Sequence, residues 1–73
     1  MKRLFLRSVE ENLPLEMIYL SSSNQITQRR IIVREINEFT IRAYCHLRKQ
    51  TRLFKIENIL SLMPLTNYRR NLG

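Results

Sequence analysis

A short stretch in the second half of the chain gathers the side chains best suited to chemistry. Residues 43–60, AYCHLRKQTRLFKIENIL, combine a tyrosine, the only histidine and several basic residues in one predicted hairpin. Arginine presents a planar fork of donors that suits phosphate, and a tyrosine in basic surroundings can stack on a base. This pattern indicates a basic face that meets phosphates or another anionic ligand. The alternative is an ordinary solvated surface.

The charge balance favours an anionic partner. The 73 residues include 13 Lys or Arg against 6 Asp or Glu, which gives a formal net charge of +7, and ten of the basic residues are arginine. Phosphate contacts release counterions and dominate the affinity for a polyanion, so this excess of positive charge suits nucleic acid. A basic composition without a specific role is the alternative explanation.

Catalysis is not expected from this composition. The chain has no aspartate, and its single cysteine and single histidine, Cys45 and His46, are adjacent. Neighbouring side chains of a strand point to opposite faces, so these two cannot form a dyad or share a metal. Cys45 is better explained as a small core residue. We therefore expect no enzyme activity, no metal and no cofactor.

The sequence also bears on location. A single cysteine cannot form an internal disulfide, which is typical of a reducing cytoplasm. The apolar run at residues 4–6 follows basic residues but is too short for an export signal, and no stretch has the length of a membrane span. We expect a cytoplasmic protein without a membrane partner.

The first element that must position these side chains is a helix over residues 2–12. Its charges oppose the helix macrodipole, with basic residues at the start and acidic residues at the end, so packing must hold it. Asn12 is suited to end the helix, and Pro14 cannot continue it. The face predicted to meet the core consists of Leu4, Phe5, Ser8, Val9, Asn12 and Leu13.

The rest of the chain is predicted to form short strands with turns between them. Residues 21–24 are a plain turn signal, and residues 48–51 are predicted to turn the chain of the basic hairpin. One helix followed by about five short strands suggests a small closed barrel, because closure removes exposed edges. The predicted strands are residues 15–20, 26–33, 39–48, 52–56 and 59–63.

The strictest pattern is an alternation over residues 39–48, which predicts a strand with one buried face. Pairing this strand with the next one places Tyr44 opposite Lys55 on the polar face. It also places Arg52 on the apolar row, where water, a carboxylate such as Glu16 or Glu38, or a bound anion must compensate its charge. The apolar row of the first strand is Phe39, Ile41, Ala43, Cys45 and Leu47.

These motifs resemble those of a known family. The run Ala43-Tyr44-Cys45-x-x-Arg48-x-x-x-Arg52-x-Phe54-x-Ile56-x-x-Ile59 resembles the carboxy-terminal half of the WYL domain. Upstream, Ile18-Tyr19 and Arg29-Arg30-x-Ile32 are similar to that family's earlier strands, so the resemblance covers about residues 5–63. The namesake Trp-Tyr-Leu tripeptide is Phe39-Thr40-Ile41 here, which loses the central tyrosine.

The resemblance implies an Sm-like, Src-homology-3-type small β-barrel of about five strands preceded by one N-terminal α-helix. Such domains usually follow a DNA-binding winged helix in bacterial transcription regulators and are thought to sense a ligand. It implies a single WYL-like domain over residues 1–73, with a helix at 2–12, a barrel at 15–63 and a loose basic tail at 64–73. Carried over residue by residue, the best ligand candidates are Arg29 or Arg30, Arg48 and Arg52.

Two functions remain open from the sequence. The first is a non-enzymatic regulatory module that binds nucleic acid, with single strands favoured, or a nucleotide-like ligand. The second is a protein–protein interaction subunit, either a homodimer or an accessory partner of a larger regulator, because a core this small often needs a second subunit. The predicted ligand-binding residues are Arg29, Arg30, Arg42, Tyr44, His46, Arg48, Arg52 and Lys55.

Overall fold

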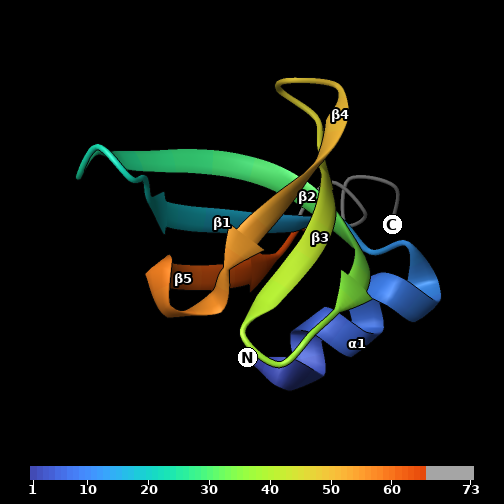
Figure 1. Cartoon of the computed structure of the whole chain (residues 1–73). Coiled ribbons are helices and arrows are strands. Elements are labelled where there is room, and N and C mark those ends of the chain that lie inside the picture. Colours follow the sequence, from blue (N-terminus) through green and yellow to red (C-terminus); the bar gives the residue numbers. More distant parts are fainter. Residues whose placement is uncertain (66–73) are drawn as a thin grey trace.

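A computed structural model of the chain describes residues 1–65, which form one helix and a five-stranded antiparallel sheet (Figure 1). The strand order in the sheet is β4-β3-β2-β1-β5. The prediction of a mainly β fold behind one helix is therefore confirmed. The elements are α1 (Lys2–Glu11), β1 (Leu15–Leu20), β2 (Ile26–Ile36), β3 (Thr40–Cys45), β4 (Gln50–Lys55), the short 3-10 helix η1 (Ile56–Asn58) and β5 (Ile59–Pro64).

Helix α1 ends where the sequence predicts. Asn12 takes the left-handed conformation, with φ 54° and ψ 36°, which asparagine tolerates better than most residues. The helix packs mainly on β2 and buries Phe5 and Ser8. Val9, which was predicted to face the core, is exposed instead. The buried stripe is therefore narrower than the sequence pattern suggests.

Ser8 ties α1 to the sheet through two buried hydrogen bonds. Its hydroxyl donates to the carbonyl oxygen of Leu13 at 2.7 Å and accepts from the backbone N–H of Val33 at 2.8 Å. The pairing of β2 with β1 reaches only to Ile31, so the helix supplies the acceptor that β1 does not offer to Val33. Ser8 therefore satisfies two backbone groups that would otherwise be buried without partners.

The core lies between α1 and one face of the sheet. The removal of the apolar side chains of this core from water is the main favourable contribution to folding. Met17, Ile31 and Cys45 come from three neighbouring strands and are fully buried, which fits the pairing of β3, β2 and β1. The buried apolar residues are Phe5, Leu13, Leu15, Met17, Ile31, Val33, Ile41, Ala43, Cys45, Phe54 and Ile59.

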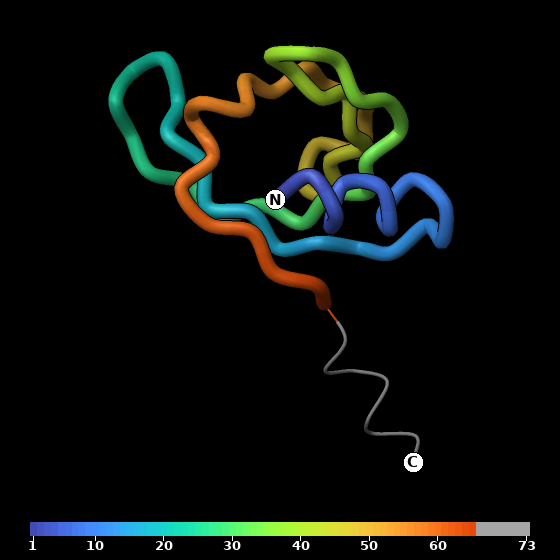
Figure 2. Tube along the Cα trace, turned by 90° about the horizontal axis from the view of Figure 1, so that it is seen from below, coloured from blue at the N-terminus to red at the C-terminus, as the bar shows by residue number. Residues whose placement is uncertain are grey.

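The sheet is curved but open, so the closed barrel predicted from the sequence is not formed. Strands β4 and β5 are the two edges of the sheet in residues 1–65 and do not pair with each other. Tyr19 of β1 nevertheless reaches β4. Its hydroxyl accepts from the backbone N–H of Lys55 at 2.9 Å, and its ring meets that of Phe54 edge-on, with centroids 5.1 Å apart. Because β2 and β3 lie between these strands, the sheet must bend strongly, and Figures 1 and 2 show β4 turning back across it.

The basic hairpin turns earlier than predicted. Residues 46–49 form the loop, which is closed by a hydrogen bond from the backbone N–H of Lys49 to the carbonyl oxygen of Cys45 at 2.7 Å. Lys49 has a φ of 54°, in the left-handed region that lysine rarely adopts, so its residue type gives no reason to expect a turn here. Phe39 and Leu47, at the ends of the predicted buried row, are 73% and 72% exposed.

The earlier turn changes the partners across the hairpin. Tyr44 lies opposite Thr51, and Lys55 lies opposite Thr40, so the predicted pair of Tyr44 and Lys55 is wrong. The shift is an even number of residues, which leaves the inward and outward faces unchanged. Arg52 therefore still lies on the inward face, opposite Ala43.

The end of the described chain differs slightly from the prediction. Pro64, expected in a loose tail over residues 64–73, is the last residue of β5, and the backbone N–H of Leu65 donates to the carbonyl oxygen of Pro14 at 2.9 Å. Residues 66–73 of that predicted tail lie outside the described residues. Within residues 1–65, the structure contains no helix with the length and apolar character needed to cross a membrane.

Candidate anion-binding site

A small cleft gathers three of the predicted ligand residues. It has a volume of about 300 Å³ and lies where β2 passes the loop between β3 and β4. The backbone N–H of His46 donates to the carbonyl oxygen of Arg30 at 3.0 Å, which holds the loop against the strand. The residues that line this basic cleft are Gln28, Arg29, Arg30, His46 and Leu47. None of them is acidic.

The two neighbouring arginines that line the cleft lie on opposite faces of β2. Arg30 is exposed on the outer face, whereas Arg29 is half-buried on the face that carries the core. The guanidinium carbon of Arg29 lies 5.9 Å from the centroid of the Phe54 ring, and its Nε donates to Thr27 Oγ1 at 3.3 Å. In residues 1–65 neither arginine forms an ion pair. Arg29 is thus held in place by an aromatic ring and a hydroxyl group rather than by a carboxylate.

Cys45 anchors the loop beside the cleft. Its buried sulfur accepts hydrogen bonds from the side chain of Arg29, at 3.8 Å from Nη1, and from the backbone N–H groups of Arg48 and Leu47. Burial raises the pKa of the Cys45 thiol, but these hydrogen bonds and the charge of Arg29 outweigh burial and leave the pKa below its usual value. The sulfur therefore fixes both Arg29 and the loop that carries His46 and Arg48.

An aromatic ring continues the basic surface on the outer face of the sheet. The ring of Tyr44 meets the His46 ring edge-on, with centroids 5.3 Å apart, and the guanidinium carbon of Arg34 lies 5.9 Å from the Tyr44 centroid. Arg34 also donates to the side-chain oxygen of Asn12 at 3.4 Å. Tyr44 is only half-buried, so part of its ring remains available for contact.

Arg34 was not among the predicted site residues. The pairing of β2 with β3 shifts by one residue between Val33 and Glu35, which makes Arg34 the extra residue of a β-bulge. Bulges re-aim side chains, and this one places Arg34 beside Tyr44. The sequence offers no turn residue at this point that would have indicated the bulge.

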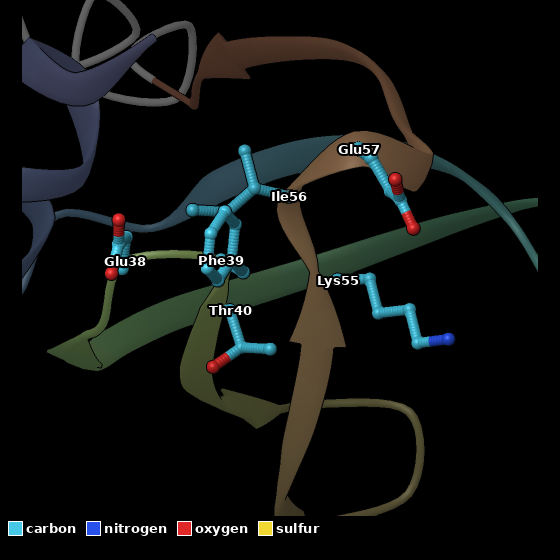
Figure 3. A pocket seen from close by; sticks show the side chains of 6 residues that line it. All are labelled: Glu38, Phe39, Thr40, Lys55, Ile56 and Glu57. Carbon is cyan, nitrogen blue, oxygen red and sulfur yellow. The ribbon is translucent and has the colours of Figure 1, made fainter.

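The structure separates the other predicted residues from the basic cleft. Arg42 forms an exposed ion pair with Glu35 at 3.7 Å. Lys55 lines a different cleft of about 380 Å³ with Glu38, Phe39, Thr40, Ile56 and Glu57, where its side chain extends away from Phe39 (Figure 3). Arg48 belongs to the loop next to His46 and is exposed.

Arg52 stands apart as well. It is exposed, and in residues 1–65 it has no carboxylate within ion-pair distance, so neither Glu16 nor Glu38 compensates its charge. Gln28 instead engages the carboxylate of Glu16. Among residues 1–65, no group of three His, Cys, Asp or Glu side chains is arranged to hold a metal ion.

Comparison with known proteins places the fold but not the ligand. No family model and no curated protein matches the sequence. Among solved structures, the chain is similar to the proteasome accessory factor B/C (PafBC) of Arthrobacter aurescens, with a TM-score of 0.78 and 22% identity over 88% of this chain. The chain corresponds to only 11% of the length of that protein. At this identity the likeness shows the fold alone: the helix and its five-stranded sheet recur as a small part of a larger protein.

Proposed function

We propose that this chain is a non-enzymatic regulatory module that binds single-stranded nucleic acid or a nucleotide-like anion in the basic cleft. The observation that carries the proposal is the composition of the cleft, which joins Arg29, Arg30 and His46 without a carboxylate in its lining. Two guanidinium groups that form no ion pair in residues 1–65 suit a phosphate, which can accept several charge-assisted hydrogen bonds. The nearest acidic residue in the pairing of the strands is Glu16, which lies opposite Arg30 and accepts a hydrogen bond from Gln28.

The neighbouring ring gives a reason to favour a nucleic acid over a simple anion. Tyr44 lies next to His46, and Arg34 lies against the same ring. In this arrangement a phosphate occupies the cleft while an adjacent base packs on the exposed part of the Tyr44 ring. Such stacking needs an unpaired base, which is why single strands are favoured over duplexes.

The sequence resemblance to the WYL domain supports a regulatory role. That family is associated with ligand sensing in transcription regulators, and the matching arginines here include the pair that lines the cleft. We interpret the curved sheet, bridged by Tyr19 between β1 and β4, as a relative of the Sm-like barrel that is open between β4 and β5. A module of this kind would act within a larger regulator or beside one.

Salt dependence tests the proposal. If about three phosphates contact the cleft and its loop, the binding constant for a labelled single-stranded oligonucleotide should fall with salt, with a log–log slope of about −2. Fluorescence anisotropy over a range of salt concentrations measures this slope. Binding that ignores salt, or no binding at low salt, would contradict the proposal.

Matched ligands complete this experiment. A duplex of the same length should bind more weakly than the single strand, because its bases are not free to meet Tyr44. DNA and RNA strands of the same sequence, and a free nucleotide, then identify the class of ligand. Equal affinity for the duplex and the single strand would remove the role proposed for the tyrosine ring.

The second candidate function is protein–protein interaction. The observation that favours it is the exposure of Phe39, a large apolar side chain that projects beside Ile56 in the cleft of Figure 3. Large exposed aromatic residues often mark interaction surfaces. Two results together would support this second function instead. The wild type would fail to bind oligonucleotides, and the Phe39→Ser variant would no longer bind a protein partner that the wild type binds.

A further inference from the structure

The outer side of α1 carries apolar side chains that residues 1–65 leave partly exposed. Leu6 and Val9, three residues apart on one side of the helix, are 45% and 36% exposed, and Met1 is 54% exposed. A shallow cleft of about 550 Å³ begins beside Leu6 and continues to Ile36 and Ile56. This uncovered surface is distinct from the basic cleft: Figure 1 shows α1 and the loop between β3 and β4 on opposite sides of the molecule.

The charges of α1 are arranged against its own dipole. Lys2 and Arg3 lie at the positive start of the helix, while Glu10 and Glu11 lie at its negative end. Within residues 1–65, the one ion pair of this helix joins Arg7 to Glu11 at 3.6 Å, and it is exposed. Lys2, Arg3 and Glu10 are left without an ion pair in this part of the chain. The arrangement costs stability in an isolated helix but would be favourable beside an antiparallel one.

We propose that a second copy of this chain docks on the outer side of α1, with the two helices antiparallel about a two-fold axis near Leu6. Residue 6 lies near the middle of the helix, so this axis brings Leu6 of the two copies together. The same register places Lys2 next to the partner's Glu10, and symmetry repeats the contact. The partner's Val9 then lies near Met1 and the start of the shallow cleft.

Charge complementarity selects this occupant and this orientation. The surface is self-complementary only when the helices run in opposite directions, because a parallel pair would bring the basic starts of both helices together. Antiparallel helices also place each basic start beside the negative end of the partner's helix dipole. The apolar residues between the two charged ends supply the buried area, as in ordinary helix packing.

Sedimentation equilibrium tests this interface on the whole chain. The wild type should form a dimer at micromolar concentration, and Leu6→Glu should raise its dissociation constant at least tenfold, because two carboxylates would meet at the axis. Ile26→Glu is the matched control: Ile26 is 67% exposed and is the first residue of β2, and Figure 1 shows the turn between β1 and β2 far from α1. It should leave the dissociation constant unchanged. Far-UV circular dichroism and a thermal melt check that both variants are folded.

A charge exchange tests the orientation of the helices. Lys2→Glu and Glu10→Lys should each weaken self-association several-fold, since each places like charges at both symmetric contacts. An equimolar mixture of the two variants should recover the wild-type affinity through a heterodimer. A wild type that stays monomeric, a Leu6→Glu variant that still dimerises, or a mixture that shows no recovery would overturn the proposal. None of these results depends on whether the basic cleft binds an oligonucleotide.

Discussion

Replacing Arg29 and Arg30 together by alanine should weaken the binding of a single-stranded oligonucleotide by at least about a hundredfold, because each charge-assisted hydrogen bond contributes about 1.5–3 kcal/mol. Both side chains line the basic cleft, and neither forms an ion pair in residues 1–65. Their charges are therefore available to a phosphate without breaking a contact to a carboxylate. Fluorescence anisotropy at low salt measures the affinity of the variant and of the wild type.

The double replacement of Arg42 and Lys55 is the matched control. It also removes two positive charges, but from residues outside the basic cleft. Arg42 is paired with Glu35, and Lys55 lines the different cleft shown in Figure 3. This variant should lose only the small, non-specific part of the attraction. Equal weakening in both double variants would show that the net charge binds the strand, and that no site exists.

A stability check keeps the result interpretable. Arg29 contacts the Phe54 ring and the sulfur of Cys45, so its removal also perturbs the core face. Arg30 is exposed and makes no such side-chain contact in residues 1–65. The single variant Arg30→Ala should therefore melt like the wild type while it loses about half of the binding free energy that the double variant loses.

Replacing Ser8 by alanine should lower the free energy of unfolding by about 2 kcal/mol, because two buried backbone groups lose their partners. The Ser8 hydroxyl joins the carbonyl oxygen of Leu13 to the N–H of Val33, and the Ser8 side chain is fully buried. For a domain of this size such a loss corresponds to a fall in Tm of about 10 °C. Thermal melting followed by circular dichroism measures it.

Ser22 provides the control for this replacement. It lies in the exposed turn between β1 and β2, where a Ser→Ala change should alter the free energy of unfolding by less than about 0.5 kcal/mol. If Ser8→Ala melted at the wild-type temperature, the hydroxyl would not connect the helix to the sheet in the way described.

Elements set by local chemistry could be predicted from the sequence. The helix ends at Asn12, which accepts the left-handed conformation, and β1 has the predicted bounds because its β-formers stop at a turn of serines. The alternation of residues 41, 43 and 45 identified the buried face of β3 correctly. These features depend on a few neighbouring residues, so the chain carries the information locally.

Features that depend on pairing across the sheet could not be predicted. Lys49 closes the hairpin loop in a conformation that its residue type disfavours, so the turn begins two residues before the predicted one. An earlier turn separates Lys55 from Tyr44, and the bulge at Arg34 brings a different cation to that ring. The sheet is open because its edge strands β4 and β5 do not pair with each other, and Tyr19 of β1 reaches β4 only through its side chain.

The candidate site also depends on pairing across the sheet. Residue type marked the arginines of the middle of the chain other than Arg34 as ligand candidates, and Arg29, Arg30 and His46 do line one cleft. Nothing in the local sequence indicates that Glu35 lies beside Arg42, because the two residues come from different strands. Only the paired sheet separates an arginine that forms an ion pair from one that does not.

Amide chemical-shift mapping with a short single-stranded oligonucleotide tests the central claim most directly. The proposal predicts that the largest shifts fall on the backbone of residues 28–30 and 44–48, with Arg34 beside them, and that α1 is little affected. Saturation of these shifts at a common dissociation constant would show one site. Shifts spread evenly over all basic residues, shifts centred on Phe39 and Lys55, or no shifts at low salt would contradict a nucleic-acid site in the basic cleft.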